Sequence, residues 1–316
     1  MSRRSPLATP ARKNLREILL RWYDRHQRKL PWRGQRDPYL ILVSEIMLQQ
    51  TRVAVVEERY KRFIKQFPTV ERLARARAST VLAAWSGLGY YRRARSLHAA
   101  ARLVVRSGGF PRSAEDLQQL PGIGRYTAAA LASIAFAEPA AVVDGNVRRV
   151  LSRMTGRNLS ERQCWIVAGV LLDGRRPGDF NQALMELGAV VCLPTGEPLC
   201  GDCPVASLCA SRRSVTRPRR QKARRKAVLS YSYACKDGQV LLRRRPNESS
   251  LMPRMWELPE MAFPATRSQP LLKLRHSITV TDYTVTVFRG KKQIFPNTRW
   301  VPLRNVERLP LTGLAR

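Results

Sequence analysis

Apolar residues in the first two thirds of the chain recur at intervals of three and four, which places them on one face of an α-helix. Ser113 and Ser160 each stand three residues before a polar side chain, as residues that cap a helix N-terminus often do. Glycine and proline separate the periodic segments. We therefore expect one mainly α-helical domain over residues 15–211, with helices over 14–25, 38–50, 53–66, 80–85, 90–106 and 126–136.

The period changes to two after residue 227. Segments 228–234 and 239–243 alternate on either side of a turn, and segment 277–288 is rich in Val, Thr and Tyr, as strands are. We expect a small α+β domain over residues 228–316. Before it, residues 212–227 hold nine basic side chains and no acidic one, so this linker either lies along phosphate groups or is simply solvated.

The charge of the chain points to a polyanionic partner. Lys and Arg number 57 against 23 Asp and Glu, which gives a net charge of +34. Charge alone leaves nucleic acid, an acidic membrane surface and an acidic protein open. Residues 1–14 are a basic tail without an apolar signal segment, and no apolar run reaches the roughly 20 residues that a membrane span needs.

Four of the six cysteines lie within eighteen residues of one another. They are Cys192, Cys200, Cys203 and Cys209. Four thiolates this close in sequence suit a four-iron four-sulfur cluster, and zinc is the alternative. We expect Cys164 and Cys235, on a predicted helix and a predicted strand, to be packing residues. Clustered cysteines in a chain of this length argue against a disulfide framework and indicate a reducing compartment.

A short glycine-containing segment, LPGIG at 120–124, joins two predicted helices. Two glycines in a tight turn let backbone N–H groups face outward at the start of the second helix, which is a site for phosphate that ignores base sequence. Gly122, Gly124 and Arg125 are therefore candidate DNA contacts.

Two carboxylates stand out by their position. Glu45 lies among apolar residues, and burial beside a cleft would raise its pKa and suit it to general acid catalysis. The alternative is that Glu45 belongs to the polar face of an amphipathic helix, together with Ser44 and Gln49. Asp144 precedes a predicted helix, where it caps that helix, serves a site, or does both.

The order of the motifs along the chain carries a family resemblance. The motifs are LPWR (30–33), SEIMLQQT (44–51), GLGYYRRARSLH (87–98), LPGIGRYTAAA (120–130), VDGNVRRVLSR (143–153), FNQALMELGAVVC (180–192) and the cysteine cluster. Through them the chain resembles the helix-hairpin-helix DNA glycosylases, and among these the MutY-type adenine DNA glycosylases. The resemblance implies a helical glycosylase domain over 15–211 with an iron–sulfur cluster loop at 192–209. Segment 238–260 resembles the nudix-like lesion-recognition domain of the same family.

The resemblance implies a role for each matching side chain. Glu45 falls on the glutamate that protonates adenine and later activates water, and Asp144 falls on the aspartate that stabilises the sugar cation or bonds to it transiently. Tyr126 and Asn146 fall on positions that support this pair. The matches to residues lining the extruded adenine are Arg28, Trp32, Arg33 and Gln182. The matches to residues that fill or flank the gap in the duplex are Gln50, Thr51, Leu88 and Tyr90.

The chain departs from the family pattern in two places. Seven residues separate Cys192 from Cys200 where the family usually has six. In the C-terminal domain, Ile278-Thr279-Val280 stands where the family has a Phe-Ser-His loop that contacts 8-oxoguanine, so Thr279 keeps the hydroxyl and the histidine is lost. We expect a weaker preference for 8-oxoguanine over guanine as the base opposite adenine.

The resemblance predicts a monofunctional DNA glycosylase that removes adenine mispaired with 8-oxoguanine or guanine, acting as a monomer on double-stranded DNA and not at a membrane. No lysine lies between Lys65 and Lys222, and Tyr126 stands where related lyases place lysine, so an amine for a Schiff base is missing. The alternatives are a thymine glycosylase for T·G mismatches, an endonuclease III-like lyase and a non-catalytic iron–sulfur DNA-binding module. The implied compartment is the nucleoid-containing cytoplasm of a bacterium, or the nucleus or mitochondrion of a eukaryote.

Overall fold

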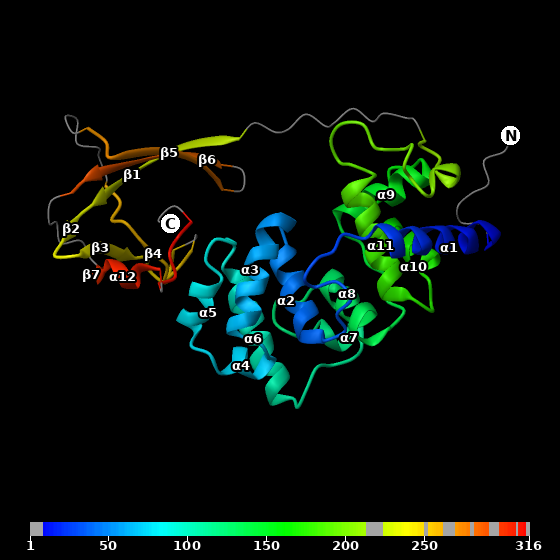
Figure 1. Cartoon of the computed structure of the whole chain (residues 1–316), viewed down its shortest axis with the longest axis horizontal. Coiled ribbons are helices and arrows are strands. Elements are labelled where there is room, and N and C mark those ends of the chain that lie inside the picture. The colour runs from blue at the N-terminus through cyan, green and yellow to red at the C-terminus, as the bar shows by residue number, and fades with distance from the viewer. Residues whose placement is uncertain are drawn as a thin grey trace. The chain divides into compact units, whose positions relative to one another are not determined.

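A computed structural model gives the fold of the chain (Figure 1). The structure describes residues 9–212, 224–249, 252–261, 269–278, 281–290, 297–307 and 309–313. The chain divides into two compact units. The first joins Met1–Ile64 to Ala99–Arg219, and the second joins Lys65–His98 to Arg220–Arg316.

The regular secondary structure of the described residues before 213 is helical, as the three- and four-residue spacing of apolar positions predicts. The helices are α1 (Thr9–His26), α2 (Pro38–Leu48), α3 (Val53–Gln66), α4 (Val70–Arg75), α5 (Ala78–Ala84), α6 (Arg92–Arg106), α7 (Ala114–Leu117), α8 (Arg125–Phe136), α9 (Gly145–Thr155), α10 (Glu161–Leu171) and α11 (Pro177–Val190). A short 3₁₀ helix, η1, covers Ala206–Leu208. Both predicted caps are confirmed, because the hydroxyls of Ser113 and Ser160 accept bonds from the backbone N–H three residues on. Helix α2 ends two residues earlier than predicted, and Gln50 beyond it has φ +55°, which a continuing helix does not allow.

The core of the first unit gathers around α11. Helix α11 packs against α1, α8 and α9. Phe180, Leu184 and Leu187 lie at helical spacing on α11 and are almost fully buried, as are Leu15 and Leu19 on α1. Burial of each such side chain contributes roughly 1.5–3 kcal/mol, so this apolar face fixes where α11 lies.

Two glycines on α11 let it approach its neighbours closely. A Cβ atom at Gly178 would lie 2.6 Å from the Ser133 carbonyl oxygen on α8, and one at Gly188 would lie 2.6 Å from Cβ of Asn146 at the start of α9. Between them, buried Asn181 accepts a bond from the Val142 N–H at 3.2 Å. Its amide also donates to the Ser133 hydroxyl at 2.9 Å and to the carbonyl of Ala140 at 2.8 Å. Helix α11 therefore holds the segment that leads into Asp144.

The second unit contains β-strands, as the period-two pattern after residue 227 predicts. They are β1 (Arg225–Tyr233), β2 (Cys235–Lys236), β3 (Gln239–Arg244), β4 (Trp256–Glu257), β5 (Leu272–Ile278), β6 (Thr281–Arg289) and β7 (Thr298–Pro302), followed by the short helix α12 (Leu303–Val306). One sheet has the order β1-β6-β5, with β1 parallel and β5 antiparallel to β6. In the other, β3 pairs with β2, β4 and β7.

The structure differs from the sequence prediction in the strands of segment 277–288 and in the environment of Cys235. Segment 277–288 is not one strand, because β5 and β6 pair antiparallel and Ile278 lies opposite Thr281. Thr279, the candidate lesion contact, lies outside the described residues, as do positions 213–223 of the linker. Cys235 is exposed, so the expectation that it packs is wrong, whereas Cys164 is buried in the core of the first unit.

Helical residues 65–98 belong to the same compact unit as the strands, although their apolar period resembles that of the preceding helices. The Tyr91 hydroxyl donates to the Leu311 carbonyl at 2.7 Å, and the Arg95 guanidinium donates to the Pro253 carbonyl at 2.7 Å. No described helix is both long and apolar enough to cross a membrane.

We expect Gly178→Ala to lower the free energy of unfolding by about 1–3 kcal/mol, because the added methyl group meets the backbone of α8. Gly169→Ala on α10 is the matched control. It places the same methyl group in open space within a helix, where it should raise the free energy of unfolding by up to about 1 kcal/mol. Urea denaturation followed by circular dichroism measures both; equal effects would contradict the packing argument.

Candidate active site

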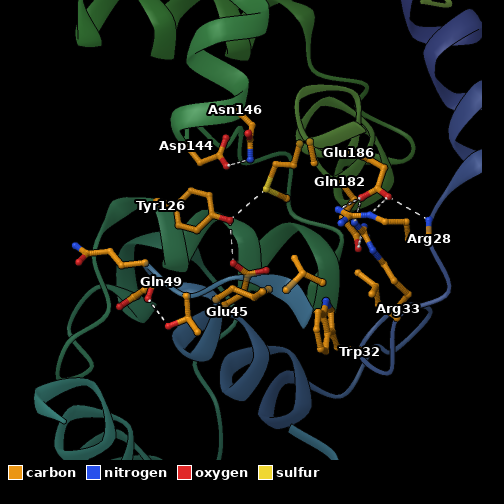
Figure 2. Close-up of a pocket in the computed structure, with 17 residues that line it drawn as sticks. Arg28, Trp32, Arg33, Glu45, Gln49, Tyr126, Asp144, Asn146, Gln182 and Glu186 are labelled. Atoms are coloured by element: carbon orange, nitrogen blue, oxygen red, sulfur yellow. Dashed lines mark hydrogen bonds and ion pairs between the residues drawn. The ribbon is translucent and has the colours of Figure 1, made fainter. Parts of the chain in front are cut away.

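A pocket of about 530 Å³ in the first unit brings together residues from five helices and from the loops before and after α2. Among its lining residues are all eight predicted catalytic and adenine-pocket residues together with two of the predicted gap-flanking residues. These are Arg28, Trp32, Arg33, Glu45, Gln50, Thr51, Tyr126, Asp144, Asn146 and Gln182. Figure 2 shows Tyr126 between Glu45 on one side and Asp144 on the other, with Gln182 and Glu186 further along the same cavity.

Glu45 is buried within α2. Its carboxylate accepts a hydrogen bond from the Tyr126 hydroxyl at 2.9 Å. Burial raises the pKa of Glu45 to about 7, the Tyr126 hydroxyl and the Arg33 guanidinium oppose this rise, and Asp144 adds to it. Ser44 is buried too and donates to the Ile41 carbonyl, so the alternative of a solvated polar face on α2 is wrong.

Tyr126 lies at the start of α8 and has two acceptors within reach. Its hydroxyl is 2.9 Å from Glu45 Oε2 and 3.1 Å from Met185 Sδ on α11. Burial, with the neighbouring charge of Glu45 and Asp144, raises the pKa of Tyr126 well above its ordinary value. The phenol therefore keeps its proton and remains a donor at neutral pH.

Asp144 is both the N-terminal cap of α9 and a wall of the pocket. Its carboxylate accepts from the Val147 N–H at 2.7 Å and from the Asn146 amide at 3.0 Å. Burial raises the pKa of Asp144, while the Val147 N–H and the Asn146 amide oppose the rise by bonding to the charged form. The two carboxylates of the pocket thus have different surroundings: Glu45 has one hydroxyl donor, and Asp144 has N–H donors at a helix start, which favour negative charge.

A third carboxylate, Glu186, was not predicted and organises the other side of the pocket. Its side chain is fully buried and forms ion pairs with Arg28 at 2.6 Å and Arg33 at 2.8 Å. Burial alone raises the pKa of Glu186, but the two guanidinium groups outweigh burial and bring it below its ordinary value. Arg33 also donates to the Gln182 amide oxygen at 2.6 Å. The signal was present in the sequence, since Glu186 lies one helical turn after Gln182 within an apolar run.

Arg149, also not predicted, connects Asn146 with the cysteine loop. Its guanidinium donates to the Asn146 side-chain oxygen at 2.8 Å, to the Gly188 carbonyl at 2.6 Å and to the Cys192 carbonyl at 2.8 Å. Four residues on, Arg153 donates to Cys192 Sγ at 3.2 Å, and its backbone carbonyl accepts from Cys209 Sγ at 3.4 Å. One face of α9 therefore lies against both ends of the loop.

The four clustered thiols lie near one another around this loop. Burial raises the pKa of Cys203 to about 11, with smaller contributions from Cys209, Cys192 and Cys200. In the described part of the chain, no group of three or more histidine, cysteine or carboxylate side chains is arranged to hold a single metal ion.

The other predicted DNA contacts among the described residues lie outside the pocket lining. In the hairpin between α7 and α8, Gly122 has φ +77° and Gly124 caps α8, where Arg125 lies 3.9 Å over the Trp165 ring. Leu88 is buried, whereas Tyr90 is 40% exposed with φ +47°. Positive φ at non-glycine residues costs free energy and often marks functional positions.

Comparisons with known proteins agree with this fold. The profile of the HhH-GPD superfamily base excision DNA repair proteins matches residues 43–163. Adenine DNA glycosylase of Homo sapiens is 50% identical over 217 residues, which cover 63% of this chain and 40% of that protein. The chain thus spans about two fifths of the length of this relative.

Solved structures are similar over the helical part. A thermostable thymine-DNA glycosylase is 33% identical with a TM-score of 0.60, and the match covers 65% of this chain and 97% of that one. A trapped endonuclease III–DNA covalent intermediate shares the fold, with 22% identity, a TM-score of 0.55 and coverage of 64% and 97%. The chain therefore belongs to the HhH-GPD superfamily of base excision DNA repair proteins, among which it is similar to the adenine DNA glycosylases.

Proposed function

We propose that the protein is a monofunctional DNA glycosylase that removes adenine mispaired with guanine or 8-oxoguanine in duplex DNA. The observation that carries this proposal is the pairing, in one pocket, of Glu45 and Asp144 in different environments. The similarity to adenine DNA glycosylases supports adenine as the base removed. The net charge of +34 and the glycine hairpin support DNA as the partner.

The chemistry of base release explains why two such carboxylates are needed. Breaking the bond between sugar and base leaves positive charge on the sugar and negative charge on the base. With its raised pKa, Glu45 is protonated in a large fraction of molecules near neutral pH and can donate that proton to the departing adenine. Asp144, with N–H donors, stabilises the sugar cation as a carboxylate. Tyr126 and Asn146 hold these two groups in place.

The extruded base would occupy the part of the pocket lined by Trp32, Arg28, Arg33 and Gln182. Glu186 fixes both arginines, so their donors are oriented before the base arrives. None of the described residues that line this pocket is a lysine, which supports hydrolysis without a Schiff base.

We further propose that Cys192, Cys200, Cys203 and Cys209 hold one four-iron four-sulfur cluster. The neighbouring thiols contribute to the raised pKa of Cys203 and of Cys209, which shows that the four lie close together. Arg153 and Arg149 place positive charge beside this group, which would carry net negative charge as a bound cluster. A bound cluster would supply a structural cross-link that holds the 192–209 loop against α9. No step of the reaction is assigned to it.

The C-terminal strands fit a nudix-like domain that recognises the base opposite adenine, with Thr279 as its candidate contact. The resemblance of segment 238–260 and the two sheets support this assignment. A monomer is the proposed state, and a reducing compartment follows from the cysteine cluster.

Duplexes that carry A·8-oxoguanine, A·G or T·G test the proposed function. We expect adenine release from the first two, no thymine release from T·G, and strand cleavage only after alkali. Glu45→Gln should slow release about 10²–10⁴-fold with duplex binding retained, because only the proton donor is lost. Glu58→Gln, an exposed carboxylate on α3 outside the pocket, is the control and should leave release unchanged. Thymine release would indicate the mismatch thymine glycosylase, and binding without release the non-catalytic module.

The raised pKa of Glu45 should make the free energy of unfolding depend on pH. With a pKa of about 7 in the folded state against 4.5 ordinarily, the carboxyl group has no effect on stability well below pH 4.5, where it is neutral in both states. Between pH 4.5 and 7 it ionises in the unfolded chain but stays neutral in the folded one, so it destabilises the fold increasingly over this range and by a constant amount above it. The free energy of unfolding of Glu45→Gln relative to wild type should therefore rise by up to about 3 kcal/mol between pH 4.5 and 8. Urea denaturation at several pH values measures this. A difference that stays constant with pH would show that Glu45 titrates normally.

Metal analysis tests the cluster. The purified full chain should contain about four iron atoms and absorb broadly in the visible range. Cys203→Ser should lose both, whereas Cys235→Ser, which changes an exposed cysteine outside the loop, should keep both. Stoichiometric zinc without iron would replace the cluster with a zinc site.

A further inference from the structure

Tyr126 has one hydroxyl proton and two acceptors, and they lie on different helices. Glu45 Oε2 on α2 is 2.9 Å from the hydroxyl oxygen, and Met185 Sδ on α11 is 3.1 Å from it. Two dashed lines leave the Tyr126 hydroxyl in Figure 2, one to Glu45 and one to a sulfur atom. A phenol O–H donates to one acceptor at a time with good geometry. A charged carboxylate is a stronger acceptor than a neutral acid, so the charge of Glu45 biases which acceptor receives the proton.

The two protonation states of Glu45 call for opposite hydrogen bonds. When Glu45 is a carboxylate, Tyr126 donates to it, and the thioether of Met185 is left as a contact. When Glu45 gains a proton, its own O–H can donate to the Tyr126 oxygen, provided that the tyrosine proton has somewhere else to go. Rotation about the phenol C–O bond brings that proton to Met185 Sδ, so no bond other than hydrogen bonds changes.

We propose that Met185 is a positioning residue, whose sulfur accepts the Tyr126 proton while Glu45 is a carboxylic acid and so stabilises the form of Glu45 that donates to the departing base. This inference rests on the proposed function of Glu45 as an acid. A thioether is a weak acceptor and cannot be protonated, so it favours this arrangement without adding a charge to the pocket.

Other groups around Glu45 do not replace this acceptor. Asp144, at the start of α9, adds negative charge and favours the neutral acid, and Arg33, from the loop before α2, favours the carboxylate. Glu186 on α11 is paired with Arg28 and Arg33. The Asp144 carboxylate accepts from the Val147 N–H and from the Asn146 amide. Of the described side chains, Met185 is the one whose contact with Tyr126 can exchange with that of Glu45.

Met185→Leu removes the acceptor and keeps the volume of the side chain nearly constant. The Tyr126 hydroxyl can then donate only to Glu45. This hydrogen bond favours the carboxylate form and lowers the pKa of Glu45. One weak hydrogen bond corresponds to a shift of about half a pH unit. Single-turnover adenine release should match wild type at pH values below the pKa of Glu45 and fall to about one third of wild type above it. Met154→Leu, a buried methionine outside the pocket, should leave the profile unchanged.

A second measurement separates this inference from the proposed function. Isotope-edited infrared spectroscopy of the free full-length protein, with the signal assigned by Glu45→Gln, follows the titration of the carboxyl group without DNA or catalysis. Met185→Leu should lower its midpoint, and in a Tyr126→Phe background the same change should have no effect on it. An unshifted midpoint, an equal shift in both backgrounds, or a loss of rate by one factor at every pH would each overturn the role of Met185. A shifted midpoint in a protein that releases no base would retain the hydrogen-bond exchange and reject the function.

Discussion

Close contact between the backbone of α11 and its neighbours is the constraint on which the candidate site depends. A side chain at Gly178 or Gly188 would meet the backbone of α8 or the first residues of α9. Because glycine has only a hydrogen atom there, α11 lies close enough to contribute Gln182, Met185 and Glu186 to a pocket that is also lined by residues of α2, α8, α9 and the loop before α2. Asn181, on the same helix, ties down the segment before Asp144.

Within that pocket, three carboxylates occur in three electrostatic settings. Glu45 is buried with a hydroxyl donor, Asp144 accepts N–H bonds at a helix start, and Glu186 lies between two guanidinium groups. Burial raises the pKa of Glu45 and of Asp144, but N–H donors oppose the rise at Asp144, whereas two guanidinium groups lower the pKa of Glu186. The three carboxylates thus differ in their tendency to hold a proton because different hydrogen-bond donors and cations surround each of them.

The sequence predicts the helices, the caps and the first two carboxylates because each depends on local spacing or on polarity against an apolar background. Glu186 shows the same contrast but was overlooked, since its partners Arg28 and Arg33 lie more than 150 residues away. Nothing in the sequence around Arg149 distinguishes it, because the three oxygen atoms to which it donates are brought together only by the fold. The break between β5 and β6 was missed for a related reason: a run of Val, Thr and Tyr alternates in the same way on both sides of a reversal.

The bond between the Tyr91 hydroxyl and the Leu311 carbonyl joins residues 220 positions apart in the chain. During synthesis the chain emerges from its N-terminus, so helical residues 65–98 leave the ribosome long before the strands of their own compact unit exist. The first unit is also interrupted by this segment in sequence. The core around α11 can therefore form while residues 65–98 still lack the strands of their own unit, so a segment that is made early completes its packing late.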